Sequence, residues 1–507
     1  MQAQTPVPFA GPLNNLGSPT IGGNSELEPD ICWQAMRSRD PRFDGRFFVA
    51  AVTTGIYCRP VCPVPFAKPN NIALFPCAAA AEAAGFRPCL RCRPETAPGT
   101  PAWAGTSAVV SRTLRLIWDG ALDAGNVEEL AERVGIGSRQ LRRLFTQYLG
   151  VPPIKIANTH RLHFARNLIE QTDMPMAEIA LNAGFKSIRQ FNHAVLTTAG
   201  HSPSELRRLR GYLSDSSRRG ELTMRLFYRP PLHWPALMSF LGSRATPGVE
   251  LVTANSYQRT VDTEAGAGVI DVRPDQKDAC LNVRVALPKY SGLLRVVERV
   301  RRVFDLRADP LHIDAYLSRD RRLKPLIDSR PGLRVPGVWD GFEVAVRAAL
   351  GQRLISVDSN KVAGELARKF GRPIDSFVDG LTHLFPRPED LADADLSLPG
   401  IARECAASIK LLARGLCNPE LTLESFRTLQ DTISQLSAIE GLDQDMAHYI
   451  AMRALGEPDA FPLEESLISQ LGPDEILTSE RALSVAEGWR PWRAYAAMHL
   501  WADSAAL

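Results

Sequence analysis

Four cysteines in two short pairs are the residues of this 507-residue chain whose type and spacing point most clearly to chemistry. The stretch GIYCRPVC contains Cys58 and Cys62, and GFRPCLRC contains Cys89 and Cys92. Zinc prefers four soft ligands in a tetrahedron and usually takes them from closely spaced pairs. The spacing therefore predicts a zinc site, and the alternative is four core cysteines without a metal.

The remaining cysteines lack this pairing, and we interpret them as ordinary core residues. The first 25 residues have no basic segment followed by an apolar core, so they do not resemble a secretory signal. We therefore expect a cytoplasmic protein, in which thiols stay reduced and metal binding is favoured over disulfides. The cysteines of this second group are Cys32, Cys77, Cys280, Cys405 and Cys417.

The elements that position these residues must belong to several domains, because a chain of 507 residues is too long to fold around a single hydrophobic core. With 45% hydrophobic and 23% charged residues and no membrane-spanning apolar run, the chain has the composition of globular domains. Stretches rich in Pro, Gly and polar residues mark the boundaries. They predict a flexible tail at 1–28, a cysteine domain at 29–95, a linker at 96–107, a helical domain at 108–210, a linker at 211–221 and a large domain at 222–507.

The cysteine domain carries a specific family resemblance. DPRFDGRFFVAAVTTGIYCRPVCP, followed by AAEAAGFRPCLRCRPE, resembles the N-terminal domain of the Ada family of alkylation-response proteins. The resemblance implies a small zinc-bound α/β domain in which one cysteine removes the methyl group from a DNA methylphosphotriester. By motif position the acceptor is Cys58, and the other ligands are Cys62, Cys89 and Cys92.

The chemistry of a zinc–thiolate cluster suits that role. Zinc keeps a thiolate deprotonated at neutral pH, and the thiolate is the nucleophilic form of cysteine. Four thiolates around Zn²⁺ carry a formal charge of about −2, and methylation of one sulfur leaves about −1, which weakens repulsion from the DNA backbone. Candidate phosphate contacts, with a solvated basic face as the alternative, are Arg59, Lys68, Arg87, Arg91 and Arg93.

The helical domain repeats one pattern. NVEELAERVGIGSRQLRRLFTQYLG (126–150) predicts a helix, a Gly-containing turn and a basic second helix, and 174–203 repeats it. A long helix between them would hold two helix-turn-helix units about one DNA turn apart. The architecture resembles the AraC-type DNA-binding domain. Base-reading candidates near the start of each second helix are Arg139, Gln140, Arg143, Arg189, Gln190 and Asn192.

The large domain begins with alternating apolar and polar residues, which predict a small antiparallel sheet layer within 222–290. Helical periodicity dominates 291–507. Segments 330–357, 436–468 and 488–501 resemble the 3-methyladenine DNA glycosylases of the helix-hairpin-helix type. The predicted fold class is therefore multidomain and mainly α, with α+β parts in the first and third domains.

This third domain departs from the glycosylase pattern at the places that carry its chemistry. Glu465 stands at the catalytic Asp position, one methylene longer than the family residue. The hairpin keeps Gly441, but Asp443 replaces the second glycine and Asp445 replaces a pocket tryptophan. An ungapped alignment puts Arg353 at the wedge that fills the gap left by a flipped base, and a one-residue shift puts Leu354 there. Trp501 is retained.

Two functions follow from these resemblances. The first is a methylation sensor that takes one methyl group on Cys58 and then activates transcription through promoter DNA and RNA polymerase, with a degenerate glycosylase-like domain. The second is a bifunctional protein that also excises alkylated purines. A zinc-containing regulator without methyl transfer remains a third possibility. In all three, zinc is the cofactor and double-stranded DNA is the partner.

Overall fold

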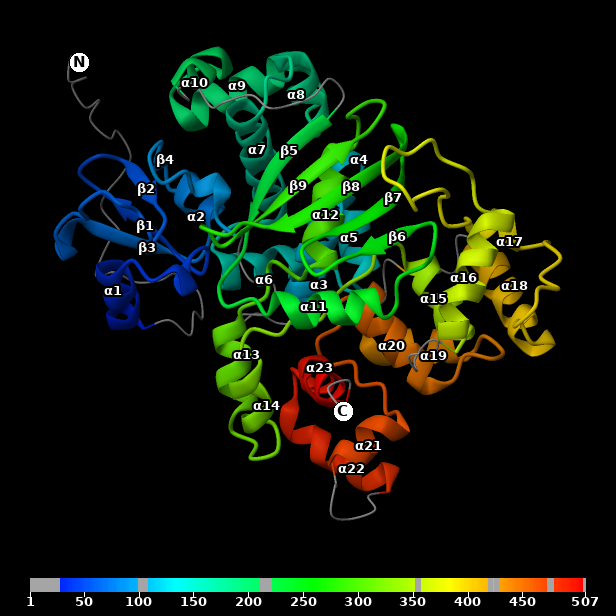
Figure 1. Cartoon of the computed structure of the whole chain (residues 1–507). Helices are drawn as coiled ribbons and strands as arrows, with labels where there is room; N and C mark the ends of the chain where they lie inside the picture. The colour runs from blue at the N-terminus through cyan, green and yellow to red at the C-terminus, as the bar shows by residue number, and fades with distance from the viewer. Residues whose placement is uncertain are drawn as a thin grey trace.

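The computed structural model describes residues 28–98, 108–209, 221–351, 357–417, 423, 428–471 and 478–504. Helices predominate, and two separate sheets lie in the first and third parts of the chain (Figure 1). The predicted multidomain, mainly α fold class is confirmed. Among the described residues, no helix is both long and apolar enough to cross a bilayer.

The cysteine region is a four-stranded sheet with one helix before its first strand and a second helix between β3 and β4. Its strands are ordered β3-β1-β2-β4, and β2 pairs in parallel with the short β4. Successive residues of β1 face opposite sides, so Phe48 and Val49 belong to two different small apolar clusters. The elements are α1 (Pro29–Ser38), β1 (Phe48–Ala51), β2 (Ile56–Cys58), β3 (Ile72–Phe75), α2 (Ala78–Ala83) and β4 (Arg87–Pro88), with short 3₁₀ turns at Pro41–Phe43, Pro69–Asn71 and Pro94–Thr96.

The packed region extends past the predicted boundary at residue 95. Thr96 and Ala97, which the sequence assigns to a linker, are buried. The physical reason is that the Arg59 guanidinium donates a hydrogen bond to the Thr96 hydroxyl, 2.6 Å away. Outside the described residues lie 1–27 of the tail, 99–107 of the first linker, residue 210 of the helical domain and 211–220 of the second linker. Glu221, which the sequence assigns to the second linker, is instead the first residue of β5 (Glu221–Phe227), because it pairs with Ala286 of β9 (Cys280–Ala286).

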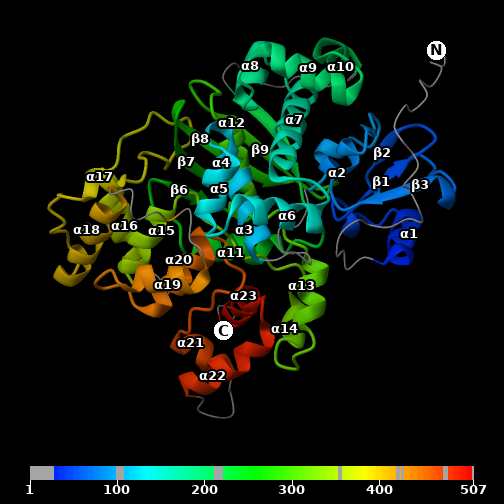
Figure 2. The ribbon, with the colours of Figure 1, turned by 180° about the vertical axis from the view of Figure 1, so that it is seen from behind.

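The second region is all helical and contains both predicted helix-turn-helix units. They lie at opposite ends of the long helix α7, as Figures 1 and 2 both show. Gly150 and Gly200 end the second helix of each unit with φ of 75° and 72°, a left-handed conformation that favours glycine. The helices are α3 (Ala108–Trp118), α4 (Ala121–Ala124), α5 (Val127–Arg133), α6 (Ser138–Leu149), α7 (Pro153–Gln171), α8 (Met176–Asn182), α9 (Ile188–Ala199) and α10 (Pro203–Leu209).

The third region starts with the predicted antiparallel sheet, which has five strands in the order β5-β9-β8-β7-β6. Helix α12 packs its apolar residues into the same core as the sheet. The elements of this part are β5 (Glu221–Phe227), α11 (Trp234–Gly242), β6 (Glu250–Val252), β7 (Tyr257–Thr263), β8 (Gly266–Pro274), β9 (Cys280–Ala286) and α12 (Leu293–Val303).

Helices make up the rest of the third region and bury a second, larger core. The hairpin predicted from the sequence lies between α19 and α20, and α23 closes the chain. The helices are α13 (Pro310–Leu317), α14 (Lys324–Ser329), α15 (Gly341–Ala349), α16 (Val357–Phe370), α17 (Pro388–Leu391), α18 (Arg403–Cys417), α19 (Leu429–Ser437), α20 (Gln444–Ala454), α21 (Glu465–Leu471), α22 (Ser479–Ala486), a 3₁₀ turn at Glu487–Trp489 and α23 (Arg493–Ser504).

Asp305, which follows α12, gives this region a testable pH dependence. Burial raises the pKa of its carboxyl group to about 6, although Arg334 and a hydrogen bond from Tyr495 oppose the shift. A carboxyl whose pKa is higher in the folded state stabilises the fold at low pH and loses that effect as pH rises through 6. Asp305 has φ of 47°, a conformation that asparagine tolerates well.

We therefore expect Asp305→Asn to be more stable than the unmodified protein at pH 8, by up to about 3 kcal/mol. Its free energy of unfolding should also change less between pH 4 and pH 7. Chemical denaturation across this range measures both effects, and Asp328→Asn, at an exposed side chain, is the control. An unchanged pH profile in Asp305→Asn would contradict the prediction.

Candidate metal centre and nucleic-acid interface

The sheet brings the two cysteine pairs together. Strand β2 ends at Cys58 and the parallel β4 leads directly into Cys89, whose N–H donates to the Tyr57 carbonyl, 2.9 Å away. A turn after β2 then returns the chain so that the N–H of Cys62 donates to the Arg59 carbonyl. The ligand atoms of all four cysteines, including Cys92, lie within 4.8 Å of one another.

This donor set fits zinc. Four sulfurs bound tetrahedrally at about 2.3 Å from an ion stand about 3.8 Å apart, within the observed separation. The N–H of Arg59 also points to the sulfur of Cys92, at 3.4 Å, which supports a thiolate at that position. The cluster predicted from spacing is therefore assembled, and its closeness favours zinc over the alternative of four core cysteines without a metal.

The four cysteines differ in exposure. Cys62 is fully buried and Cys89 and Cys92 are each 8% exposed, whereas Cys58 is half-buried. A reagent as large as DNA can reach only a sulfur near the surface, so exposure favours Cys58 over the other three as a reactive atom. The remaining cysteines are not clustered with them, and Cys417, expected in a core, is exposed.

Two of the arginines predicted to contact phosphate have other roles. Arg59 is only 9% exposed and forms an ion pair with Asp44, while its Nη1 donates to the Cys92 carbonyl at 3.2 Å. Arg93 forms an ion pair with Glu170 of α7. Sequence alone shows a basic residue beside a cysteine, but the buried carboxylates that pair with it come from distant segments. Lys68 and Arg91 are exposed and Arg87 is half-buried, so these three stay candidates.

The predicted base-reading side chains all reach solvent. Helix α6 buries Leu141, Phe145 and Leu149, and α9 buries Phe191, Val195 and Ala199, so each helix packs along one face. The six candidates occupy the exposed face in the first half of each helix: Arg139, Gln140, Arg143, Arg189, Gln190 and Asn192. This placement suits insertion into DNA grooves, and base contact by any one of them stays a prediction.

The spacing of the two units also suits DNA. Helix α7 has 19 residues and is therefore about 28 Å long. Successive major-groove faces lie about 34 Å apart, so helices carried at the two ends of α7 can approach neighbouring turns.

In the third region, Trp501 belongs to an aromatic group. Its ring stacks on Phe240 of α11 with centroids 6.2 Å apart and meets the edge of Tyr449 of α20 at the same distance. The phenol of Tyr449 accepts a hydrogen bond from Arg453, 2.7 Å away. Burial raises the pKa of Tyr449, but the positive charges of Arg453, Arg244 and Arg347 lower it by more, so the pKa lies below its usual value. Trp501 therefore lies in a cluster of aromatic side chains, and its place in a glycosylase pocket stays a prediction.

The hairpin residues have structural partners of their own. Gly441 has φ of 87°, and a Cβ there would collide with the Ser408 hydroxyl. Asp443 caps α20, since its carboxylate accepts a hydrogen bond from the Met446 N–H at 2.8 Å. Asp445 accepts a hydrogen bond from the Leu463 N–H, 3.1 Å away, and so ties α20 to the segment that precedes α21. Both carboxylates therefore lie at the start of α20, where their negative charge disfavours an anion.

Glu465 is the first residue of α21. Arg353 and Leu354, the two candidates for the wedge, lie outside the described residues.

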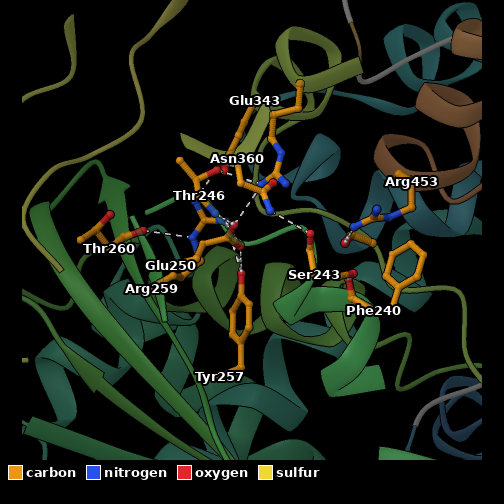
Figure 3. A network of polar contacts seen from close by, with 12 residues as sticks. Phe240, Ser243, Thr246, Glu250, Tyr257, Arg259, Thr260, Glu343, Asn360 and Arg453 are labelled. Atoms are coloured by element: carbon orange, nitrogen blue, oxygen red, sulfur yellow. Dashed lines mark hydrogen bonds and ion pairs between the residues drawn. The ribbon is translucent and has the colours of Figure 1, made fainter. Parts of the chain in front are cut away.

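A buried polar network that was not expected from the sequence also lies in this region (Figure 3). Arg259 of β7 forms an ion pair with Glu343 of α15 at 2.8 Å, and Tyr257 donates a hydrogen bond to Glu250 at 2.6 Å. This network joins the five-stranded sheet to the helical core that contains Trp501 and its aromatic neighbours. Strand alternation could have revealed it, because Arg259 shares the buried face of β7 with Tyr257 and Val261.

Comparisons with known proteins agree with this geometry. Three family models match parts of this chain: the metal binding domain of Ada at residues 31–95, a helix-turn-helix domain at 130–209 and the AlkA N-terminal domain at 223–340. A Mycobacterium tuberculosis protein named "Probable bifunctional transcriptional activator/DNA repair enzyme AlkA" is 39% identical over 477 residues, covering 93% of this chain and 95% of that protein.

Two further proteins each match about half of this chain. "DNA-3-methyladenine glycosylase 2" of Escherichia coli is 30% identical over 279 residues, which are 54% of this chain and 95% of that protein. A solved 3-methyladenine DNA-glycosylase from Archaeoglobus fulgidus shares the fold, with a TM-score of 0.50 and 18% identity over 56% of this chain and 98% of that one. Together with the cysteine cluster and the paired helix-turn-helix units, the comparisons show that this chain belongs to the Ada/AlkA family of bifunctional transcriptional activators and DNA repair proteins, and that it combines a zinc-binding domain with a glycosylase-like domain.

Proposed function

We propose that the protein senses DNA alkylation by accepting a methyl group on Cys58 and responds as a transcriptional activator. The single observation that carries the proposal is the cluster of four cysteines in which Cys58 alone is half-buried rather than buried. We also propose that the chain divides into domains as the sequence predicts, at 29–95, 108–210 and 222–507, with the first domain extended to Ala97 and the third begun at Glu221.

The reaction is a direct displacement. The Cys58 thiolate attacks the methyl carbon of a DNA methylphosphotriester, an S–C bond forms, and the C–O bond breaks with its electron pair moving to the phosphate. The products are a thioether and an ordinary phosphodiester anion, so no other reactant is needed. Bound zinc would keep the thiolate deprotonated, and the thioether that forms is chemically stable, so each protein reacts once.

The charge change links this reaction to promoter binding. The cluster loses about one negative charge on methylation, which reduces repulsion from DNA phosphates. The exposed faces of α6 and α9 would then read the promoter, and a contact with RNA polymerase would complete activation. A salt titration of DNA binding should show higher affinity for the Cys58-methylated form at each salt concentration.

Peptide mapping by mass spectrometry tests the acceptor directly. After incubation with methylphosphotriester-containing DNA, the unmodified protein should carry one added methyl group, on Cys58. Cys58→Ser should carry none, and Cys417→Ser, at an exposed cysteine outside the cluster, should react normally. Methyl found on Cys62 or Cys89 would refute the assignment.

We propose further that the glycosylase-like domain is degenerate. Asp443 caps the helix whose first turn would hold DNA phosphate, and Asp445 is tied to Leu463. The aromatic group of Trp501, Tyr449 and Phe240 favours the second candidate, a working glycosylase. Release of free 3-methyladenine from alkylated DNA, compared between the unmodified protein and Glu465→Gln, separates the two.

A further inference from the structure

We propose that the glycosylase-like domain serves as an intramolecular docking platform, which holds the helix-turn-helix region and the zinc region in one fixed arrangement. This role is separate from base excision. It rests on three sets of contacts that join the third region to the helix-turn-helix region, and on further contacts that join it to the zinc region.

The first set is apolar. Buried residues of α7 to α10 and of the five-stranded sheet belong to one continuous cluster, which includes Leu168, Ile179 and Leu206 from the helices and Leu222 and Val285 from the sheet. Strand β5 is an edge of that sheet, and Gln171 at the end of α7 accepts a hydrogen bond from the Arg225 N–H, 2.9 Å away. An exposed edge invites wrong pairing, so the helical region also protects the sheet.

The second set joins α3 to the segment after α20. Arg115 forms an ion pair with Glu457 at 2.7 Å and donates a hydrogen bond to the Leu455 carbonyl, and Arg112 approaches the same carboxylate at 3.5 Å. Glu457 is only 6% exposed. A buried carboxylate needs such partners, so the third region depends on α3 to neutralise Glu457.

The third set lies between α7 and α12. His160 contacts the Glu298 carboxylate at 3.1 Å, and Arg307 contacts its other oxygen at 2.5 Å. The Arg307 guanidinium in turn lies 4.0 Å from the ring centroid of Trp118, the last residue of α3. Glu298 is 4% exposed, so this contact is also an interior one.

The zinc region is held by the same platform. Arg46 forms an ion pair with Asp309 at 2.8 Å, and the Arg59 guanidinium lies 5.6 Å from the ring centroid of Phe227 in β5. It is also joined to α7, because Glu82 accepts hydrogen bonds from Tyr57 at 2.8 Å and Thr159 at 2.6 Å. Each region therefore contacts the other two.

These contacts leave the predicted reading surfaces exposed. The platform contacts α3, α7 and the zinc region, whereas the candidate readers on α6 and α9 face solvent. Docking therefore fixes the reading helices relative to Cys58 before DNA binds, which reduces the freedom lost on binding.

Charge reversal at Arg115 tests the proposal in the full-length protein. In Arg115→Glu, a second carboxylate faces Glu457, so α3 should leave the platform. We expect hydrogen exchange at least tenfold faster in α3 and at residues 455–457, with β1 to β3 unchanged. Affinity for duplexes selected from a random library by the unmodified protein should fall about tenfold.

The rescue and the control use two further variants. Adding Glu457→Arg to Arg115→Glu should restore part of the exchange protection and part of the DNA affinity. Lys324→Glu, at an exposed ion pair, should change neither of these two properties.

A second variant guards against simple misfolding of the helical region. Glu457→Gln removes the charge from the platform side, leaves α3 intact and should give a smaller change in the same direction. Exchange in α5 and α6 reports whether the helix-turn-helix unit stays folded. If α3 exchange or DNA affinity is the same in both single variants as in the unmodified protein, the platform role is refuted. Methyl uptake by Cys58 is measured separately, so failure here leaves the sensor function standing.

Discussion

Cys89→Ser should release zinc and unfold the cysteine region, while most of the glycosylase-like domain stays folded. The apolar core of this region is divided into two small clusters on opposite faces of the sheet, and the four cysteines form a third. A domain of this size buries too little apolar surface to fold readily alone. Structural zinc can contribute about 10 to 16 kcal/mol in small metal domains, more than such a core can replace.

Zinc content and hydrogen exchange measure this outcome together. Cys89→Ser should bind less than one tenth of the normal zinc, and amides of β1, β2 and β3 should lose protection. Cys417→Ser, at an exposed cysteine outside the cluster, should match the unmodified protein in both measurements. A metal-free Cys89→Ser protein whose sheet stays protected would contradict the prediction.

The same experiment reports how far zinc loss spreads. Glu82 accepts hydrogen bonds from Tyr57, which precedes Cys58, and from Thr159 of α7. Burial raises the pKa of Glu82, but the contact with His163 and these two hydrogen bonds lower it by more. The pKa therefore lies below its usual value, and the carboxylate stays charged. When the sheet unfolds, Glu82 leaves α7, and exchange near Thr159 should increase as well.

The zinc cluster could be predicted from the sequence because its signal is local. Two short pairs of cysteines specify a tetrahedral thiolate site whatever the rest of the chain does, and the fold needed only to bring β2 beside β4. The helix-turn-helix units could also be predicted from the sequence, because the helical periodicity and the glycines that end the helices, such as Gly150, lie within a few residues of one another.

Contacts between distant segments could not be predicted in the same way. Arg59 stands beside a cysteine in a basic stretch, and nothing local shows that it pairs with Asp44 and lies against Phe227. Likewise, nothing near Arg115 in the sequence indicates that it forms an ion pair with Glu457, which lies more than 300 residues later in the chain. Ion pairs of this kind depend on how whole regions pack, which has no short-range signature.

The hairpin shows an intermediate case. The sequence identifies Asp443 and Asp445 as departures from a family pattern, and charge alone predicts repulsion of phosphate. The structure adds what these carboxylates do: one caps α20 and the other holds the Leu463 N–H. Substitution at either position therefore removes a hydrogen bond that holds α20 in place.

Restoring base excision should require changes at all three positions, Glu465, Asp443 and Asp445. A carboxylate about 5 Å from a phosphate costs on the order of 1 kcal/mol even in a solvated setting. Loss of an aromatic surface costs about 1 to 3 kcal/mol for each stacked base. Together these amount to about 10²-fold or more in rate, before the altered catalytic carboxylate is considered. Glu465→Asp alone should therefore leave excision undetectable.

Combining Glu465→Asp with Asp443→Gly and Asp445→Trp should yield measurable release of 3-methyladenine from alkylated DNA. Glycine is an acceptable helix cap, so Asp443→Gly should cost only a few tenths of a kcal/mol, whereas Asp445→Trp also leaves the Leu463 N–H without its acceptor. Thermal unfolding of the triple variant controls for that loss. The matched control replaces Glu465 by Gln in the same background, which should abolish the recovered release, because the flipped base would stack but no carboxylate would face the developing positive charge. Robust excision by the unmodified protein would overturn the proposal that this domain is degenerate, and the Trp501 group would then belong to a working active site.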